Sequence, residues 1–236
     1  MPRLNVILPC HNEAANLERV VDGLLQVLPQ LDAAVTLTIV DDGSTDPTPE
    51  IVRRLGERYP NIRSIRHDHN RGYGGAVISG LRATDDGYAA IMDADGQFDA
   101  TDLVNLFRRV NACDVVVGYR ARRADPMGRR LLGCLWTLTG RCLFGIRLRD
   151  LNCGLKVFKL SAIRPWELQC IGPGINMEIM SQVFAAGNPV KEVGCKHRAR
   201  TSGKQSGASL PVVLKGLSEL AGMIAARRRF RPARKE

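Results

Sequence analysis

Short apolar runs alternate along the chain with stretches in which apolar residues recur at helical spacing. The runs predict strands buried on both faces, and the periodic stretches predict amphipathic helices. In the first half of the chain the predicted strands are Leu4–Leu8, Val35–Val40, Ile62–Ile65, Tyr88–Met92 and Asp114–Val117. The helices predicted between them are Leu17–Leu28, Ile51–Arg58, Ala76–Ala83 and Leu103–Val110.

Strands that alternate with helices predict an α/β fold, with a mainly parallel sheet and helices on both faces. Beyond residue 120 the pattern is looser. Helices are predicted at 129–145, 177–186 and 210–229, and strands at 155–158 and 190–197. The last helix carries an apolar stripe from Val212 to Ile224, which can either pack on the core or lie in a membrane interface. We expect it to pack on the core. We predict one main domain over residues 1–208, followed by an amphipathic helix and a basic tail over 209–236.

Polar residues and glycines gather where the predicted strands end. In a parallel sheet these ends meet at one edge, where ligands bind. Any one of the segments could be a turn or a helix cap, but all four together are hard to explain by capping alone. The four segments are Pro9–Glu13, Asp41–Asp46, His67–Gly75 and Asp93–Gln97.

Asp93 and Asp95 are the most informative chemical feature of this edge. Two carboxylates just past a buried strand concentrate negative charge, which a hard divalent cation such as Mg²⁺ or Mn²⁺ would offset while bridging to diphosphate oxygens. Gln97 can add a neutral oxygen ligand. An Asp-x-Asp pair alone is common in turns, so the prediction of a metal site depends on the neighbouring strand ends.

The glycine-rich segment 70–76 superficially suggests a phosphate-binding loop. It lacks the lysine and Ser/Thr of a P-loop, and it does not follow the first strand as a dinucleotide-binding fingerprint should. We therefore expect its glycines to allow close chain packing beside a ligand.

The histidines and cysteines offer weaker candidates. His67 and His69 are spaced like metal ligands but lack a third partner in the sequence, so we expect them, with His197, to be polar loop residues. Cys153 has no histidine base nearby and reads as a packing residue. Seven scattered cysteines without a CxxC pair predict free, mostly buried thiols in a reducing compartment.

The net charge of +10 is concentrated at the C-terminal end. Residues 191–236 hold 12 Lys/Arg against 3 Asp/Glu, whereas residues 1–190 hold 22 against 21. Such a segment attracts nucleic acid, anionic lipid or a phosphorylated substrate, or it is a solvated tail. The sequence has neither a signal-peptide pattern nor an apolar run of about 18 residues. We therefore expect a cytoplasmic protein without a transmembrane helix.

Together these segments resemble glycosyltransferase family 2, and within it the polyprenol-phosphate sugar transferases related to dolichol-phosphate mannose synthase. The resemblance spans roughly residues 3–207. The matching motifs, in order, are Pro9–Glu13, Asp41–Asp46, Asn70–Ala76, Asp93–Gln97, Gly118–Arg120, Asp150–Gly154 and Arg200–Gly203.

The resemblance implies a GT-A fold with a Rossmann-like nucleotide-binding half, and it implies site residues. Asp93, Asp95 and Gln97 should hold the metal, with Ala94 beside the donor. Arg120 and Arg200 should neutralise phosphate charge. The residues implied in contacts to the base and ribose are Pro9, His11, Glu13, Val40 and Asp42.

Asp150 should lie near the sugar and the acceptor, and Asp150, Asp95 and Arg120 are the predicted catalytic residues. The implied reaction is an inverting displacement that moves a sugar from GDP-mannose or a UDP-hexose to a polyprenyl phosphate. If the acceptor is a phosphate, with a second pKa of about 6, no strong base is needed. If it is a hydroxyl, Asp150 is the first candidate for the base.

The sequence departs from the family pattern at three places. His11 stands where many members have tyrosine, the segment after Arg200 reads Gly203-Lys204-Gln205-Ser206 in place of Gly-x-Ser-Lys, and no membrane helices follow. With a lipid acceptor, the basic run from Arg227 to Lys235 would dock the protein peripherally on the cytoplasmic membrane face. Recruitment by a membrane-spanning partner is the alternative.

Three other functions stay open. A transferase acting on a polysaccharide, metabolite or protein hydroxyl would use the same donor site. A nucleotidyltransferase would need a Gly-rich, Arg/Lys-containing N-terminal loop, which is absent. A non-catalytic module that binds anionic lipid or nucleic acid fits the basic tail but leaves Asp93, Asp95, Asp150 and Arg120 unexplained, and we expect no nucleic-acid partner.

Overall fold

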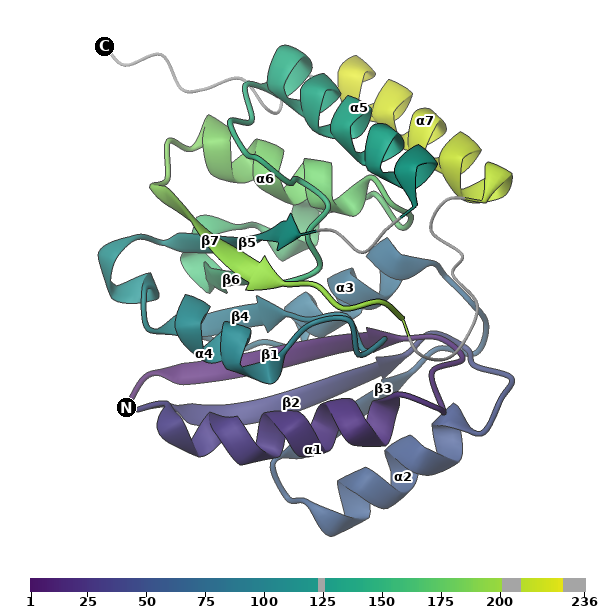
Figure 1. Cartoon of the computed structure of the whole chain (residues 1–236), viewed down its shortest axis with the longest axis vertical. Helices are drawn as coiled ribbons and strands as arrows, with labels where there is room; N and C mark the ends of the chain where they lie inside the picture. The colour runs from purple at the N-terminus through teal and green to yellow at the C-terminus, as the bar shows by residue number, and fades with distance from the viewer. Residues whose placement is uncertain (123–125, 201–208, 227–236) are drawn as a thin grey trace.

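A seven-stranded sheet forms the centre of the computed structural model, which describes residues 1–122, 126–200 and 209–226. The strands lie in the order β3-β2-β1-β4-β6-β5-β7 (Figure 1). All neighbours are parallel except β6, which is antiparallel to both β4 and β5. The strands are β1 (Arg3–Cys10), β2 (Ala34–Asp41), β3 (Ile62–Arg66), β4 (Tyr88–Ile91), β5 (Val115–Arg122), β6 (Lys156–Lys159) and β7 (Val190–Lys196).

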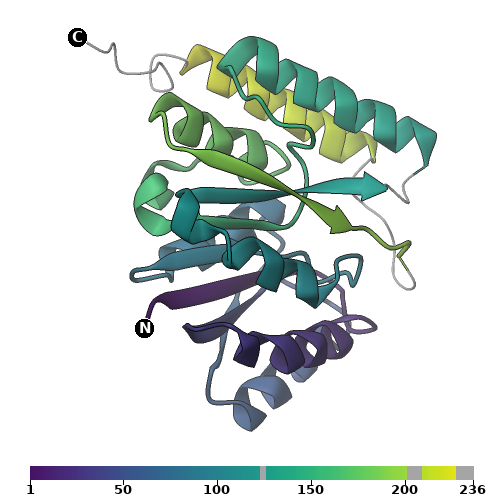
Figure 2. The same ribbon diagram turned by 60° about the vertical axis from the view of Figure 1, so that its left-hand side comes forward.

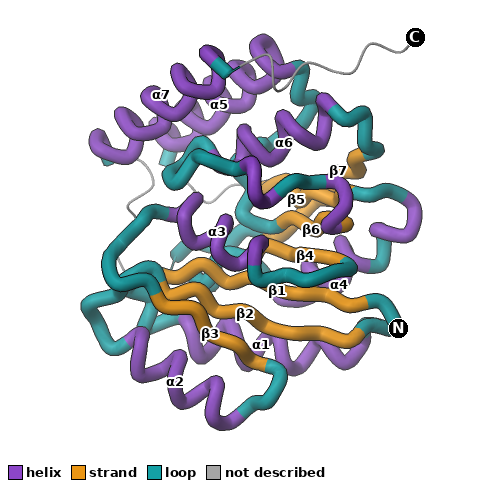
Figure 3. The backbone as a smooth tube through the Cα atoms, turned by 180° about the vertical axis from the view of Figure 1, so that it is seen from behind, coloured by secondary structure: helices purple, strands orange, loops and turns teal. Residues whose placement is uncertain are grey.

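Helices cover both faces of the sheet, as predicted. On one face α1, α2 and α4 enclose one apolar cluster, and on the other α3 and α6 enclose a second (Figures 1 and 3). Helices α5 and α7 lie side by side in an outer layer beyond α6 (Figure 2). The helices are α1 (Leu17–Val27), α2 (Thr48–Arg58), α3 (Tyr73–Arg82), α4 (Ala100–Phe107), α5 (Met127–Phe144), α6 (Ile175–Ala185) and α7 (Leu210–Ala225).

Strand register brings the predicted ligand-binding segments to one edge. Cys10 at the end of β1 pairs with Asp41 at the end of β2. Just past β4, the Met92 amide donates to the Ile7 carbonyl of β1 at 3.0 Å. The chain therefore leaves β1, β2 and β4 at nearly the same level, and the polar segments that follow these strands meet there.

The observed elements differ from the predicted ones mainly at their ends. Helices α2, α3 and α4 begin at Thr48, Tyr73 and Ala100, earlier than predicted, because their first turns are polar or glycine-rich and carry no apolar period. The antiparallel direction of β6 was not predicted. The predicted last helix is seen as α7, while residues 227–229 lie outside the described part. Within the described residues, no helix combines the length and apolarity needed to span a membrane.

Candidate active site

The loops after β1 and β2 are fastened to each other. Asn12 adopts the left-handed conformation, with φ of 56°, which asparagine tolerates better than most residues. Its Oδ1 accepts from the Thr45 amide at 2.9 Å, and its own amide donates to Ser44 Oγ at 2.9 Å. His11 Nδ1 lies 2.9 Å from the Asp42 carbonyl oxygen. These polar residues thus hold the edge of the sheet in one shape.

Asp42 anchors the next loop through its carboxylate, and one of its partners is His67. The Asp42 carboxylate accepts from the Arg71 and Gly72 amides at 2.9 and 2.8 Å, and it lies 2.6 Å from His67 Nδ1. His67 Nε2 lies 2.8 Å from Ser79 Oγ of α3. His67 lies in the loop after β3, as predicted, but it is only 3% exposed, and this burial was not predicted. Its partner is 25 residues away, and short-range spacing carries no such signal.

The glycine-rich loop packs closely against another segment, as predicted. Gly72 has a φ of 95°, which favours glycine. A Cβ at Gly74 would overlap the Cys170 carbonyl oxygen. The close packing places Tyr73 so that its hydroxyl donates to Asp93 Oδ1 at 3.0 Å.

Asp93 and Asp95 lie together beyond β4, both half-buried. Burial raises the pKa of Asp93, whereas the hydrogen bond from the Tyr73 hydroxyl lowers it. Burial, followed by the charge of Asp93, raises the pKa of Asp95 to about 6, while the Gln97 amide, which donates to Asp95 Oδ1 at 3.0 Å, lowers it. The pair is therefore a concentration of negative charge that the protein compensates only in part.

Four cationic side chains surround the acidic pair. Lys156, Arg120 and Arg129 lower the pKa of Asp93 by their positive charge, and Arg200 and Arg129 do the same for Asp95. Arg129 comes from the first turn of α5, and Lys156 comes from the antiparallel strand β6. Neither was predicted. A lysine inside the apolar run of residues 155–158 was the one available signal for Lys156.

Arg120 and Asp150 form a bidentate pair. Arg120 Nε donates to Asp150 Oδ2 at 2.6 Å, and its Nη2 donates to Oδ1 at 2.8 Å. Both side chains are less than a tenth exposed. Arg120 is held in place because β5 continues to Arg122, five residues beyond the predicted strand end. The structure thus joins two of the predicted catalytic residues directly.

The segment from Asp150 to Gly154 lies against Asp93. A Cβ at Gly154 would overlap the Asp93 carboxylate, so only glycine fits there without rearrangement. Cys153 is fully buried, consistent with a packing residue. Lys156 Nζ donates to the Cys153 carbonyl and, at 2.8 Å, to Asn176 Oδ1, and burial lowers the pKa of Lys156.

Arg200 connects the end of β1 with the acidic pair. Its Nη2 donates to Glu13 Oε1 at 2.5 Å, and its Nη1 lies 3.8 Å from Asp95 Oδ2. Gln97 is buried, and its amide nitrogen donates to the Arg198 carbonyl at 3.0 Å. The departure at residues 203–206 lies outside the described part of the chain.

The remaining predicted donor residues line the same edge. Pro9 and Val40 pair in register at the ends of β1 and β2, and both are buried. Ala94 is 2% exposed between the two acidic residues. All twelve predicted site residues therefore belong to this edge of the sheet or to the β5–β6 region next to it.

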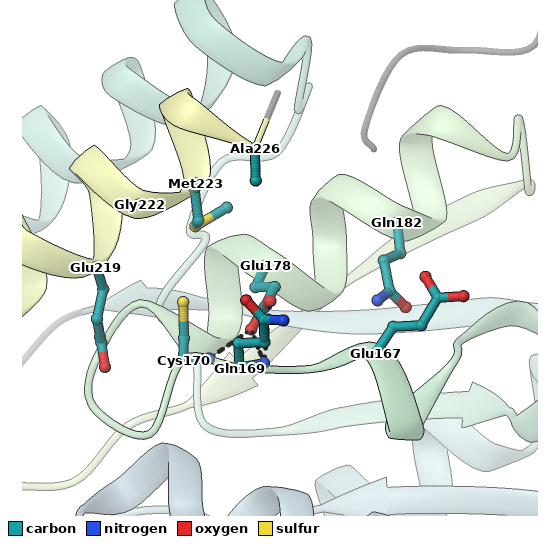
Figure 4. A pocket seen from close by; sticks show the side chains of 9 residues that line it. All are labelled: Glu167, Gln169, Cys170, Glu178, Gln182, Glu219, Gly222, Met223 and Ala226. Atoms are coloured by element: carbon teal, nitrogen blue, oxygen red, sulfur yellow. Dashed lines mark hydrogen bonds between the residues drawn. The ribbon is translucent and has the colours of Figure 1, made fainter. Parts of the chain in front are cut away.

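A separate cavity of about 190 Å³ lies beneath α7 (Figure 4). Of its three carboxylates, Glu167 pairs with Arg164 at 3.1 Å, and the other two accept from backbone amides. Glu178 accepts from Gln169 and Cys170, and Glu219 accepts from Gly172 and Gly174. These contacts fasten α6 and α7 to the loop before α6, so we assign the cavity to packing.

The sheet order, the acidic pair past β4 and the facing arginines define a GT-A glycosyltransferase. The chain belongs to glycosyltransferase family 2, whose family model, described as "Glycosyl transferase family 2", matches residues 5–164.

The seven cysteines are free and five are buried, as predicted.

Curated relatives and solved structures give the same picture. An undecaprenyl-phosphate mannosyltransferase of Micrococcus luteus is 27% identical over 202 residues, which are 81% of this chain and 82% of the relative. A dolichol-phosphate mannosyltransferase of Pyrococcus furiosus is 28% identical over 75% of this chain, which spans only 52% of that relative. A dolichyl-phosphate beta-glucosyltransferase of Dictyostelium discoideum is 29% identical over 68% of this chain and 55% of the relative.

Among solved structures, the glucosyl-3-phosphoglycerate synthase of Mycobacterium tuberculosis, in complex with Mn²⁺, UDP and glucosyl-3-phosphoglycerate, matches with a TM-score of 0.67 and 20% identity. The match covers 99% of this chain and 82% of that one. At this identity the likeness shows the fold.

Proposed function

We propose that the protein is an inverting transferase that moves a sugar from a nucleotide-sugar donor, GDP-mannose or a UDP-hexose, to a polyprenyl phosphate. The family and the printed activities of the relatives support this class of reaction. The donor would lie along the edge where β1, β2 and β4 end. Pro9, His11, Glu13, Val40 and Asp42 would contact its base and ribose.

The diphosphate of the donor would lie over Asp93 and Ala94, with Arg200 beside it. A divalent cation fits here, because Asp93 and Asp95 offer hard oxygen ligands whose raised pKa values mark uncompensated charge. Gln97 keeps its carbonyl oxygen as the available ligand atom, since its nitrogen donates to Arg198. Mg²⁺ or Mn²⁺ held by these residues would supply positive charge that stabilises a departing nucleoside diphosphate.

No three His, Cys, Asp or Glu side chains of the described residues gather as a metal cluster. The acidic pair would therefore leave coordination positions for diphosphate oxygens and water, a common arrangement for Mg²⁺ with phosphate substrates. The cation and the donor would then bind as one unit.

The Arg120–Asp150 pair is the observation that favours a phosphate acceptor over a hydroxyl acceptor. Both carboxylate oxygens of Asp150 accept from the Arg120 guanidinium, which makes Asp150 a poor proton acceptor. A hydroxyl acceptor needs a base, whereas a phosphate is already an anion at neutral pH. Asp150 would orient Arg120, and Arg120 would attract the acceptor phosphate.

A polyprenyl acceptor resides in a membrane, so the proposal includes peripheral association with the cytoplasmic membrane face, or recruitment by a membrane partner. The basic run from Arg227 to Lys235, which the sequence predicts to supply the attraction, lies outside the described residues. Nothing in the proposal requires a nucleic-acid partner.

The donor half of the proposal is tested by calorimetric titration of GDP and UDP with Mn²⁺ or Mg²⁺, alongside hydrolysis of a panel of nucleotide sugars. We expect Asp95→Asn to lose cation-dependent binding, with a drop of about tenfold or more in affinity, because one carboxylate ligand becomes neutral. The matched control is Asp22→Asn, an exposed carboxylate on α1. Unchanged affinity in Asp95→Asn, or full activity in excess EDTA, would contradict the proposal.

A further inference from the structure

Helix α5 exposes an apolar stripe to solvent. Met127, Leu131, Leu135 and Leu138 are 83, 62, 51 and 52% exposed, at helical spacing on one side of the helix. The opposite side carries the buried Thr137 and Gly140. The stripe is therefore not the core-facing side of α5, and the fold leaves it without an intramolecular partner among the described residues.

Helix α7 exposes a second stripe. Leu210, Leu214, Leu217 and Ile224 are 70, 56, 52 and 43% exposed. The core-facing side of the helix is a different one, with Gly216 and Met223 buried. The expectation that the whole stripe from Val212 to Ile224 packs on the core is therefore wrong in part, because Leu217 and Ile224 face outward.

The two stripes belong to one surface. Helices α5 and α7 lie side by side as the outermost layer (Figures 1 and 2). Gly216 of α7 lies against Trp136 of α5. We name this surface the α5–α7 face, defined by the eight exposed apolar residues given above. Of twelve large apolar side chains exposed in the described chain, these two helices contribute nine.

Charge on the α5–α7 face has one sign. Helix α5 contains no acidic residue, and its Arg130 and Arg141 are exposed at either end of the stripe. The one carboxylate of α7, Glu219, is turned inward to the Gly172 and Gly174 amides, whereas Lys215 is exposed. Among the described residues of α5 and α7, cations and no exposed carboxylate border the apolar centre. Such a surface complements that of an anionic bilayer.

The face also begins on the same side as the active site. The first turns of α5 and α7 lie on the side of the molecule where the strands end (Figure 1). A membrane in contact with Met127 and Leu210, at the starts of α5 and α7, would thus lie on the side of the molecule where the strands end.

We propose that the α5–α7 face docks the protein on an anionic bilayer surface, with the apolar stripes among the lipid headgroups and chains. A second copy is a poorer occupant, because a symmetric contact would bring Arg130 and Arg141 of both copies together with no carboxylate on the face to pair with them. This inference rests on the proposed lipid acceptor only where it orients the active site toward the membrane.

Flotation with phosphatidylcholine vesicles containing phosphatidylglycerol tests the proposal. The full chain should float. A variant combining Leu131→Gln, Leu135→Gln, Leu214→Gln and Leu217→Gln should lose about tenfold in bound fraction. The control is Trp166→Gln, which removes a 74% exposed apolar side chain outside the face. These vesicles contain no polyprenyl phosphate, so flotation is independent of whether the proposed transfer occurs.

Equal flotation of the variant, or no flotation of the full chain, overturns the proposal. So does a full chain that remains dimeric in the presence of vesicles and becomes monomeric in the variant. If the combined variant fails to fold, a labelling experiment decides. Cys134 and Cys142 are the two exposed thiols, and both lie on α5.

In the Cys142→Ser protein, an environment-sensitive fluorophore on Cys134 should shift to the blue and brighten when vesicles are added. The control carries the fluorophore on Glu57→Cys of α2, in a Cys134→Ser/Cys142→Ser background, and should show no change. No shift at Cys134, or equal shifts at both positions, overturns the proposal.

Discussion

Asp95 carries a charge that the folded protein disfavours when no cation is bound. Its pKa rises from 3.8 to about 6, chiefly through burial. Because the pKa of Asp95 is higher in the folded state, the folded protein is favoured when this carboxyl is protonated. That contribution to the unfolding free energy is fully present below about pH 3.8 and is lost as pH rises through about 6. In chelator at pH 7.5 we therefore expect Asp95→Asn to unfold with a free energy about 2 kcal/mol higher than the wild type.

Urea denaturation at several pH values measures this effect. The advantage of Asp95→Asn should shrink as pH falls from 7.5 to 4.5, because the wild-type carboxyl then becomes protonated in the folded state. Asp22→Asn should show no such trend. An Asp95→Asn protein less stable than the wild type at pH 7.5 in chelator would refute this description of the acidic pair.

Gly154 is required by the position of Asp93. We expect Gly154→Ala to displace the Asp93 carboxylate, costing about 1–3 kcal/mol in unfolding free energy and lowering the cation-dependent affinity for nucleoside diphosphate. Thermal melting and calorimetric titration measure the two effects. Gly56→Ala, on α2 where a Cβ meets nothing within 4 Å, should instead stabilise by about 0.5–1 kcal/mol. Wild-type affinity in Gly154→Ala would show that this contact is dispensable.

The sequence predicted site residues whose signal is local. Asp93 and Asp95 follow directly after a strand, and Asp150 to Gly154 matches a family motif. It missed residues whose role depends on distant partners. Burial of His67 depends on Asp42 and Ser79, and Arg129 reaches the acidic pair from another helix.

At the scale of elements, Glu219 holds α7 against the loop before α6 through two hydrogen bonds. Each of its two oxygens accepts one amide, from Gly172 at 2.6 Å and from Gly174 at 2.9 Å (Figure 4 labels Glu219 at the cavity wall). Glu219→Gln leaves one acceptor where two donors remain, so we expect a loss of about 1–3 kcal/mol in unfolding free energy.

Urea denaturation measures that loss, and faster hydrogen exchange at the Gly172 and Gly174 amides should accompany it. Ser218→Ala, one residue earlier on the exposed side of α7, serves as the control. Unchanged hydrogen exchange at these amides in Glu219→Gln would mean that apolar contacts, such as those of Met223, hold α7 and the Glu219 hydrogen bonds do not.

The elements most predictable from sequence were those with a strong period. Strands β1 and β2 and helix α1 coincide with the predicted segments to within a few residues. The direction of β6 was not predictable, because an apolar run indicates a strand but not which neighbour it pairs with. Similarly, the extension of β5 to Arg122 depends on pairing with β7, whose Cys195 meets Arg120 in register.

At the scale of the whole molecule, the proposed donor site and the proposed membrane surface lie on one side. The sheet edge gathers the acidic pair and its arginines. Helices α5 and α7, which carry the α5–α7 face, begin on the same side of the molecule (Figure 1). The sequence indicated the charge of the C-terminal segment and the stripe of α7. It did not indicate that α5 would join that stripe, because which side of a helix faces outward depends on the tertiary packing.

The proposed acceptor is a polyprenyl phosphate. The most direct measurement is incubation of the protein with a divalent cation, a short polyprenyl phosphate and the radiolabelled nucleotide sugar that it hydrolyses, with Asp93→Asn as the inactive control. The account predicts label in an organic-soluble product that mild acid releases, as expected of a sugar phosphodiester. Label that moves only into water-soluble acceptors, such as a small phosphorylated metabolite or a polysaccharide, would contradict it.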